Sequence, residues 1–213
     1  MVKITGYIKT IFSTLYYRIN THIENIRGFD FSTKESIDTL GLDKNKSEQY
    51  ESTKVLELKI WLKKIPDNDY IAIDFGSGKG LVLVELLKNK MFEYVYGVEI
   101  SQKLNYISKN NLTIFNNYNS VELLTIDAID TPMEIISKSN FFFFYNPFPE
   151  SIFKKVFERI ERSISINPRD IVLIYFNPLY SDIITKSIIF NNPKIIHNIL
   201  SNADTHIYIV DKK

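Results

Sequence analysis

The chain has 213 residues, enough for one sizeable hydrophobic core with an appended element but short for two full domains. Its 26 basic and 25 acidic residues give a formal net charge of +1, so we do not favour nucleic acid as a partner. The absence of cysteine excludes disulfides, thiolate metal sites and cysteine nucleophiles, and three widely spaced histidines do not suggest a metal centre.

No apolar run reaches the roughly 18–20 residues that a membrane span requires. The N-terminal stretch is interrupted by Lys3, Lys9 and Arg18, so it lacks the continuous apolar segment of a signal peptide. We therefore expect a cytoplasmic protein without a transmembrane segment. The sequence does not indicate its oligomeric state.

The first predicted element is an amphipathic helix that ends near Gly28. Its apolar residues recur at spacings of three and four: Ile4, Ile8, Ile11, Phe12, Leu15, Ile19, Ile23 and Ile26. Such a helix could lie on a membrane surface, given Lys3, Lys9 and Arg18. We favour the alternative, a helix that packs its apolar face on the domain, because the basic face is thin.

Residues 28–47 are polar and aperiodic and predict a surface loop. A second helix is expected from Glu51 to Ile65, because Pro66 follows and apolar residues share one face. Lys59, Lys63 and Lys64 would then form its solvated face.

From Tyr70 onward, apolar runs alternate with helical patterns. We predict strands at Tyr70–Asp74, Tyr94–Glu99, Val121–Ile126, Asn140–Tyr145 and Asp170–Phe176. A helix is expected after each strand except the third, where the pattern is weak. Two short alternating runs, "KIIHNIL" and "HIYIVDKK", predict a closing antiparallel hairpin. Together, the predicted strands, helices and hairpin indicate an α/β fold with a mainly parallel, seven-stranded sheet.

The loop after the first strand, in "AIDFGSGKG", contains three of the chain's seven glycines. A P-loop needs Ser or Thr where Gly80 stands, and the dinucleotide fingerprint needs a third glycine where Leu81 stands, so both patterns fail. The pattern present is DxGxGxG, formed by Asp74, Gly76, Gly78 and Gly80.

This pattern closely resembles the first motif of the class I S-adenosylmethionine-dependent methyltransferases, and the resemblance covers residues 50–213. It implies a Rossmann-like fold and S-adenosylmethionine as the cofactor, bound around Asp74, Gly76, Ser77, Gly78 and Gly80. Lys79 is expected to be a solvated lysine at a helix start.

Two later positions fit the same family. Glu99, with Ile100 beside it, ends the second strand, and in the family an acidic residue here accepts hydrogen bonds from both ribose hydroxyls. Asp127 and Ala128 follow the third strand, where the family holds the adenine. Glu99 could instead cap the next helix, and Asp127 could lie in an ordinary turn.

A narrower resemblance, through "GFDFSTKESIDT", "YEST" and "GVEIS", is to bacterial methyltransferases of poorly defined substrate. It implies that the segment before the core covers the cofactor cleft, with Tyr50, Glu51, Ser52 and Thr53 as candidates for closing it, and with Tyr50 and Thr53 as cofactor contacts. Leu81 departs from the arginine that this group often has. We thus expect N-terminal helices and a cleft-covering loop in residues 1–65, and the methyltransferase core in residues 66–213.

The fourth strand ends in "YNPFPE", a partial match to the Asn-Pro-Pro-Tyr/Phe motif of amino-methylating members. The resemblance implies that Asn146 and Pro147 orient the methyl acceptor, with Phe148 as an apolar wall, and that Asn146 also contacts the cofactor. Tyr145 and Glu150 are weaker candidates for this cleft. An Asn-Pro turn that merely ends a buried strand is an equal alternative.

The resulting hypothesis is methyl transfer by in-line displacement to a nitrogen of a small molecule or a protein side chain. The alternatives are an RNA or DNA methyltransferase, and a non-catalytic protein that binds S-adenosylmethionine.

Overall fold

The computed structural model describes residues 2–43, 50–116 and 119–212, with side chains from residue 9 onward. Its centre is a seven-stranded sheet in the order β3-β2-β1-β4-β5-β7-β6. The first five strands are parallel, and β7 runs antiparallel between β5 and β6. The strands are β1 (Tyr70–Phe75), β2 (Phe92–Glu99), β3 (Val121–Thr125), β4 (Phe141–Tyr145), β5 (Ile171–Phe176), β6 (Lys194–His197) and β7 (Asp204–Val210).

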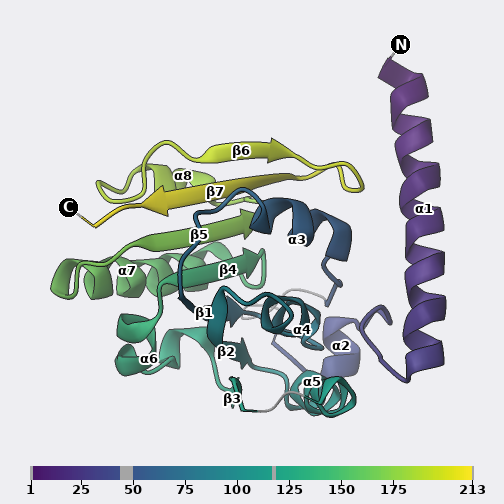
Figure 1. Cartoon of the computed structure of the whole chain (residues 1–213), viewed down its shortest axis with the longest axis horizontal. Helices are drawn as coiled ribbons and strands as arrows, with labels where there is room; N and C mark the ends of the chain where they lie inside the picture. Colours follow the sequence, from purple (N-terminus) through teal and green to yellow (C-terminus); the bar gives the residue numbers. More distant parts are fainter. Residues whose placement is uncertain (1, 44–49, 117–118, 213) are drawn as a thin grey trace.

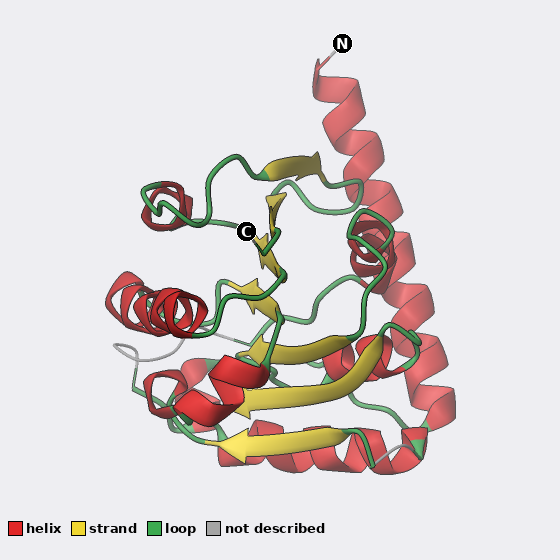
Figure 2. Cartoon of the chain, turned by 60° about the vertical axis from the view of Figure 1, so that its left-hand side comes forward, coloured by secondary structure: helices red, strands yellow, loops and turns green. Residues whose placement is uncertain are grey.

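Helices cover both faces of the sheet, as Figure 2 shows. One face is covered by α3 (Val55–Leu62), α4 (Leu81–Leu87) and α5 (Gln102–Phe115). The other is covered by the short 3₁₀ helix η1 (Ala128–Asp130), α6 (Met133–Lys138), α7 (Glu150–Ile166) and α8 (Ser181–Thr185). The predicted parallel sheet with a terminal antiparallel hairpin is confirmed.

The four consecutive phenylalanines of β4 explain why this strand lies at the centre. Phe141 and Phe143 belong to the core on the α3–α4 face, and Phe142 and Phe144 to the core on the α7 face. All four are fully buried. Successive side chains of a strand point to opposite faces, so an unbroken aromatic run suits only a strand covered on both sides.

The N-terminal part consists of α1 (Val2–Arg27), α2 (Ile37–Leu40) and the segment that leads into α3 (Figure 1). The expected packing of the α1 apolar face on the domain is wrong. The domain-facing side of α1 is polar, and Phe12 and Ile26 are 60% and 73% exposed. The reason is that α1 lies over polar backbone groups of residues 32 and 56, whose partners are Tyr17, Glu24 and Tyr16.

Several elements differ from those expected. Helix α3 spans Val55–Leu62, not Glu51–Ile65, because residues 51–54 are not helical and run along the cleft described below. The predicted loop over residues 28–47 contains the short helix α2, whose first turn Ser36 caps by accepting a hydrogen bond from Thr39 N–H; residues 44–47 lie outside the described residues. Helix α6 follows β3, where we expected none.

Leu58, Trp61 and Leu62 of α3 are buried in the core, so residues before position 66 help to build it. The division into residues 1–65 and 66–213 stays a prediction. No helix among the described residues is long and apolar enough to cross a membrane.

Candidate functional site

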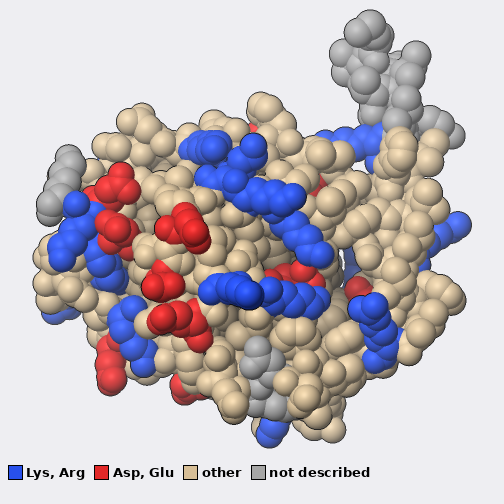
Figure 3. All heavy atoms as spheres, in the orientation of Figure 1, with Lys and Arg blue, Asp and Glu red and all other residues tan. Residues whose placement is uncertain are grey.

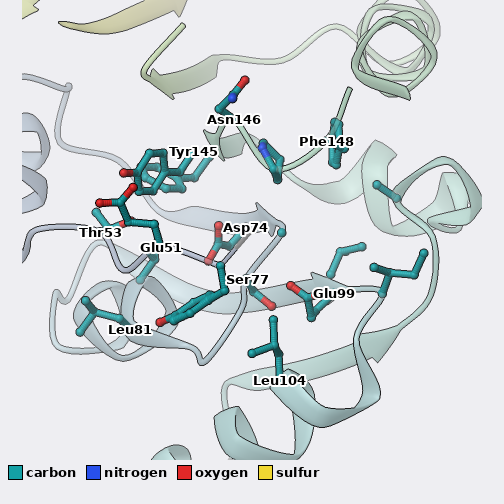
Figure 4. Close-up of a pocket in the computed structure, with 18 of the residues that line it drawn as sticks. Glu51, Thr53, Asp74, Ser77, Leu81, Glu99, Leu104, Tyr145, Asn146 and Phe148 are labelled. Atoms are coloured by element: carbon teal, nitrogen blue, oxygen red, sulfur yellow. The ribbon is translucent and has the colours of Figure 1, made fainter. Parts of the chain in front are cut away.

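A cleft opens at the carboxyl ends of the parallel strands β1 to β4. It lies beneath residues 50–53, the covering segment, which come just before α3. This edge is where ligands bind in open α/β sheets. Figure 4 shows Asp74, Ser77 and Glu99 in the cleft, between the Tyr145–Asn146 end of β4 and Leu104 of α5. Most of the predicted site residues line it: Tyr50, Thr53, Asp74, Gly76, Ser77, Glu99, Ile100, Asp127, Ala128, Asn146, Pro147 and Phe148.

The glycine loop is held by close contacts that leave no room for a side chain. Gly76 has φ +77°, and a Cβ there would lie 2.2 Å from Cβ of Pro147. Gly78 has φ +52°, and its Cβ would lie 2.4 Å from the Tyr50 ring. Only glycine combines such φ angles with such close approach. Gly78 and Gly80 thus position the loop; they do not line the cleft.

Glu99 ends β2 and is 7% exposed. Its Oε2 accepts a hydrogen bond from Gly78 N–H (2.9 Å), and its Oε1 accepts one from Ser101 N–H (2.8 Å). Burial raises the pKa of Glu99, and the backbone donors of Ser101, Gly78 and Ile100 oppose that rise. A carboxylate has about four lone-pair positions, so the side chain can still accept a hydrogen bond from a ligand.

Asp74 and Ser77 are buried polar groups beside the same cleft. Asp74 is 2% exposed, and no hydrogen bond reaches its carboxylate from the described residues. Burial, and then the nearby Glu99 charge, raise the pKa of Asp74 well above its usual range. Ser77 Oγ is buried without a hydrogen-bond partner in the described part of the chain. Native proteins rarely leave such groups unsatisfied, so both indicate a polar ligand.

An apolar slot lies at the β3 side of the cleft. It is lined by Ile100, Leu104, Ile126 and Ala128, with Asp127 at its edge. Asp127 Oδ1 accepts a hydrogen bond from Ile129 N–H (3.2 Å). Asp127 therefore stabilises a turn, as one of the two alternatives predicted, and it also lines the cleft. The slot fits a flat heteroaromatic ring between aliphatic side chains.

Sequence reasoning missed Leu104 and Ile126 as slot residues. Leu104 lies one helical turn after the N-cap residue Ser101. The backbone N–H of Leu104 donates a hydrogen bond to Ser101 Oγ (3.3 Å). An apolar residue at that position, beside the end of β2, is the signal that could have revealed it.

Lys79 is fully buried, so the expectation of a solvated lysine is wrong. Its Nζ lies 2.9 Å from Asp30 Oδ1 and 3.7 Å from Glu35 Oε1, and 5.4 Å from the centre of the Tyr50 ring. Lys103 pairs with the same Glu35. These ion pairs join the glycine loop to residues 30–35, which precede the covering segment.

The covering segment itself is held by Tyr50. Its hydroxyl donates to the carbonyl of Phe31 (2.6 Å), and its backbone forms an isolated antiparallel bridge with Glu35. Burial raises the pKa of Tyr50, which keeps the phenol neutral. Thr53 is 8% exposed and lines the cleft below it.

The end of β4 brings Asn146, Pro147 and Phe148 to the cleft. Asn146 has φ +41°, a left-handed conformation that costs energy, and its Oδ1 accepts a hydrogen bond from the Tyr175 hydroxyl (3.5 Å). Phe148 is 5% exposed and belongs to the α7-side core as well as to the cleft wall.

Tyr145 also lines the cleft, where its hydroxyl interacts with Glu51, and burial raises its pKa. Glu150 does not lie in the cleft: it begins α7 and lines a separate hollow between α7 and α8.

No model of a known protein family matches the sequence, and no curated protein matches it. Solved structures do match. A ribosomal protein L11 methylase from Lactobacillus delbrueckii subsp. bulgaricus has a TM-score of 0.56 at 12% identity, over 73% of this chain and 76% of that one. An rRNA methylase from Streptococcus thermophilus has a TM-score of 0.53 at 9% identity, over 75% and 97% of the two chains.

A third match is a Streptococcus pneumoniae protein provisionally described as a tRNA (m1A22) methyltransferase, with a TM-score of 0.54 at 11% identity over 75% and 70% of the two chains. The chain has the class I methyltransferase fold. The predicted fold class is therefore confirmed.

The methyltransferase fold corrects one expectation about partners. We disfavoured nucleic acid because the net charge is close to zero. That expectation is contradicted, since similar structures include an rRNA methylase and the protein described as a tRNA methyltransferase. Net charge averages over the whole surface, whereas binding a phosphate backbone needs only a local gathering of basic side chains. Figure 3 shows such a gathering over α3 and α4.

Proposed function

We propose that this chain is an S-adenosylmethionine-dependent methyltransferase that transfers the methyl group to a nitrogen atom. The observation that supports it best is the set of buried polar groups in one cleft. Asp74, Ser77 and Glu99 all retain hydrogen-bonding capacity there, beside an apolar slot. S-adenosylmethionine combines an ammonium group, a ribose and an adenine, which are the chemical groups that such a cleft can bind.

Each part of the cleft would hold one part of the cofactor. Glu99 would use its remaining lone-pair capacity to accept a hydrogen bond from a ribose hydroxyl. The Asp74 carboxylate would attract the ammonium group, which would offset the cost of its burial. Asp127 would bond the edge of the adenine, and the slot lined by Ile100, Leu104, Ile126 and Ala128 would hold its faces.

Methyl transfer from S-adenosylmethionine requires little of the protein beyond alignment of the acceptor with the methyl group. When bound, the cofactor supplies a methyl group already activated on a sulfonium. The chain must align the acceptor and exclude water, and such positioning can supply much of the reduction in the barrier. Asn146 is the residue proposed to align the acceptor. Tyr175 holds Asn146 Oδ1 by one hydrogen bond, which leaves a lone pair to accept a proton from an acceptor N–H.

Phe148 and Tyr145 would bound the acceptor side of the cleft. Phe148 packs edge-on against Phe144, with ring centres 6.3 Å apart, so its position is fixed by the core. Glu51 lines the same cleft, interacts with the Tyr145 hydroxyl and pairs with Lys34 (3.8 Å); its carboxylate is the group proposed to take up a proton from the acceptor nitrogen.

As the acceptor class we propose RNA. The support is the rRNA and tRNA methyltransferases among the similar structures and a band of exposed lysines on the α3–α4 side of the molecule (Figure 3). This lysine band consists of Lys59, Lys63, Lys64, Lys88 and Lys90. Lys59 and Lys88 pair with Glu85, but the net charge of the lysine band and Glu85 together is still positive.

The first test is a thermal-shift titration with S-adenosylmethionine and its demethylated product. A ligand at about 100 times its dissociation constant stabilises the folded state by about 2.7 kcal/mol, which is about 5–10 °C for a chain of this size. Glu99→Ala is expected to lose most of that shift. Glu122→Ala, at an exposed position on β3 outside the cleft, is the matched control. Absence of any shift in the wild type would reject the proposal.

The second test separates an enzyme from a non-catalytic binding protein. Methyl-labelled S-adenosylmethionine is incubated with RNA, and label is expected in RNA with the wild type but at least about 100-fold less with Asn146→Ala. Asn146→Ala is expected to keep the thermal shift, because the cofactor contacts remain. A full shift without transfer to any acceptor would indicate a binding protein.

A further inference from the structure

Helix α1 presents a continuous apolar stripe to the solvent. Six large side chains from successive turns are 42–73% exposed. Their spacings of one, three and four residues place them on one side of the helix. This side, the apolar stripe, is formed by Ile11, Phe12, Leu15, Ile19, Ile23 and Ile26.

The stripe is held outward by hydrogen bonds on the opposite side of the helix. The Tyr16 hydroxyl accepts a hydrogen bond from Leu56 N–H (2.9 Å), and the Tyr17 hydroxyl donates to the carbonyl of Ser32 (3.0 Å). Glu24 Oε2 accepts from both N–H (3.1 Å) and Oγ (2.6 Å) of Ser32. Turning the stripe toward the domain would break all of these bonds, so its exposure is built into the fold.

The charges of α1 are nearly all positive. Its sequence contains Lys3, Lys9, Arg18 and Arg27 but a single acid, Glu24. Glu24 is turned toward Ser32, and Lys9 is turned toward the domain, where its Nζ donates to the carbonyl of Asn198 (2.7 Å). Arg18 and Arg27 are exposed. In Figure 3 the outer edge of the described part of α1 shows basic and uncharged atoms but no acidic ones. An apolar stripe with basic edges is typical of helices that lie in the headgroup region of anionic membranes.

We propose that α1 docks the protein on an anionic lipid surface. The apolar stripe enters the interface while Arg18 and Arg27 lie at the level of the lipid phosphates. The helix lies in the plane of the surface and does not cross it, because its domain-facing side is polar and bonded. A second copy of the chain fits this face less well, since pairing two such stripes would bring basic edges of like charge together without an outward-facing acid to compensate.

The test uses the full chain and vesicle sedimentation. Vesicles of phosphatidylcholine alone are compared with vesicles that contain about one-third phosphatidylglycerol. We expect at least tenfold tighter binding to the anionic vesicles, and weaker binding as salt is added. Reversing the charge in Arg18→Glu/Arg27→Glu is expected to weaken that binding by at least about fivefold per side chain.

The apolar part is tested by Ile19→Asn/Ile23→Asn, which is expected to abolish sedimentation. The matched control is Ile166→Asn/Ile188→Asn, which removes two isoleucines outside α1 that are even more exposed, at 69% and 95%, and is expected to bind as the wild type does. Since all four side chains are exposed, both variants should fold, and their unfolding temperatures and circular dichroism verify this.

Two results would overturn the proposal. One is that the wild type sediments equally with both kinds of vesicle, or that the Ile19→Asn/Ile23→Asn variant sediments with anionic vesicles as much as its control variant does. The other is a lipid-free dimer, measured by light scattering, that becomes a monomer in Ile19→Asn/Ile23→Asn, because a second copy would then cover the stripe. Neither result depends on cofactor binding or methyl transfer, so the test is independent of the proposed function.

Discussion

At the scale of single residues, two buried carboxylates dominate the cleft. Asp74 and Glu99 both have raised pKa values because of burial, and the Glu99 charge raises that of Asp74 further. Glu99 has backbone donors, whereas Asp74 has none among the described residues. A buried carboxylate without a donor destabilises the ligand-free protein, which is a common cost of a preformed binding site.

That cost should appear as a pH dependence of stability. The folded state keeps a proton on Asp74 at pH values where the unfolded state has released it, so the raised pKa lowers the free energy of unfolding as pH rises above about 4. Asp74→Asn removes this contribution. We expect the stability of the variant relative to the wild type to increase with pH, as measured by thermal unfolding in a pH series. A constant difference between the two proteins would show that Asp74 has an ordinary pKa.

Gly76→Ala tests the contact between the glycine loop and the end of β4. The variant has both an unfavourable φ and a Cβ overlapping Pro147, and we expect it to lower the unfolding temperature by more than about 4 °C, through a loss above roughly 1–2 kcal/mol. Gly41→Ala is the control, because its φ is +66° but nothing lies within 4 Å of its Cβ. Equal shifts in the two variants would mean that the overlap is relieved without cost.

At the scale of elements, the glycine loop is joined to residues 30–35, which precede the covering segment, by Lys79. Its buried ammonium pairs with Asp30 and Glu35, and Tyr50 packs over Gly78 in the same loop. These contacts therefore hold the covering segment and the glycine loop together, so that a displacement of one is expected to displace the other. Asp30 is 42% exposed, so the pair is worth less than the about 3–5 kcal/mol lost on breaking a fully buried one.

Lys79→Met is expected to loosen the covering segment more than the sheet. Removing the cation leaves Asp30 and Glu35 without a common partner, so amide hydrogen exchange over residues 29–40 and 50–53 should accelerate while the β1 and β4 amides stay protected. Lys103→Met, which removes the exposed partner of Glu35, should have a smaller effect. Uniform acceleration throughout the chain would indicate global destabilisation instead.

At the scale of the whole molecule, function depends on where surface charge gathers. The lysine band lies on the α3–α4 side, whereas α7 covers the other face of the sheet. Lys63→Glu/Lys64→Glu is expected to weaken RNA binding by at least about tenfold at low salt, and to reduce its salt dependence. Filter binding against a salt series measures both.

Lys154→Glu/Lys155→Glu is the matched control, since it reverses two adjacent exposed lysines on α7. If this variant loses as much RNA affinity as Lys63→Glu/Lys64→Glu, the lysine band has no specific role and binding follows net charge alone.

The sequence by itself determined the sheet and the position of the cleft. Strand and helix periodicity predicted the alternation, and the positions of Asp74, Gly76 and Glu99 at strand ends placed these residues at one edge, because the carboxyl ends of parallel strands must lie together. Local patterns suffice for such features, since the regular geometry of a sheet brings distant residues to predictable places.

Only the tertiary structure decided the burial of Lys79, the start of α3 at Val55 and the outward turn of the α1 stripe. An amphipathic pattern identifies the two faces of a helix but not what each face meets. For α1 that choice depended on hydrogen-bonding groups at residues 32 and 56, which lie outside the helix and hold its polar side. Long-range partners of this kind have no signature in a local stretch of sequence.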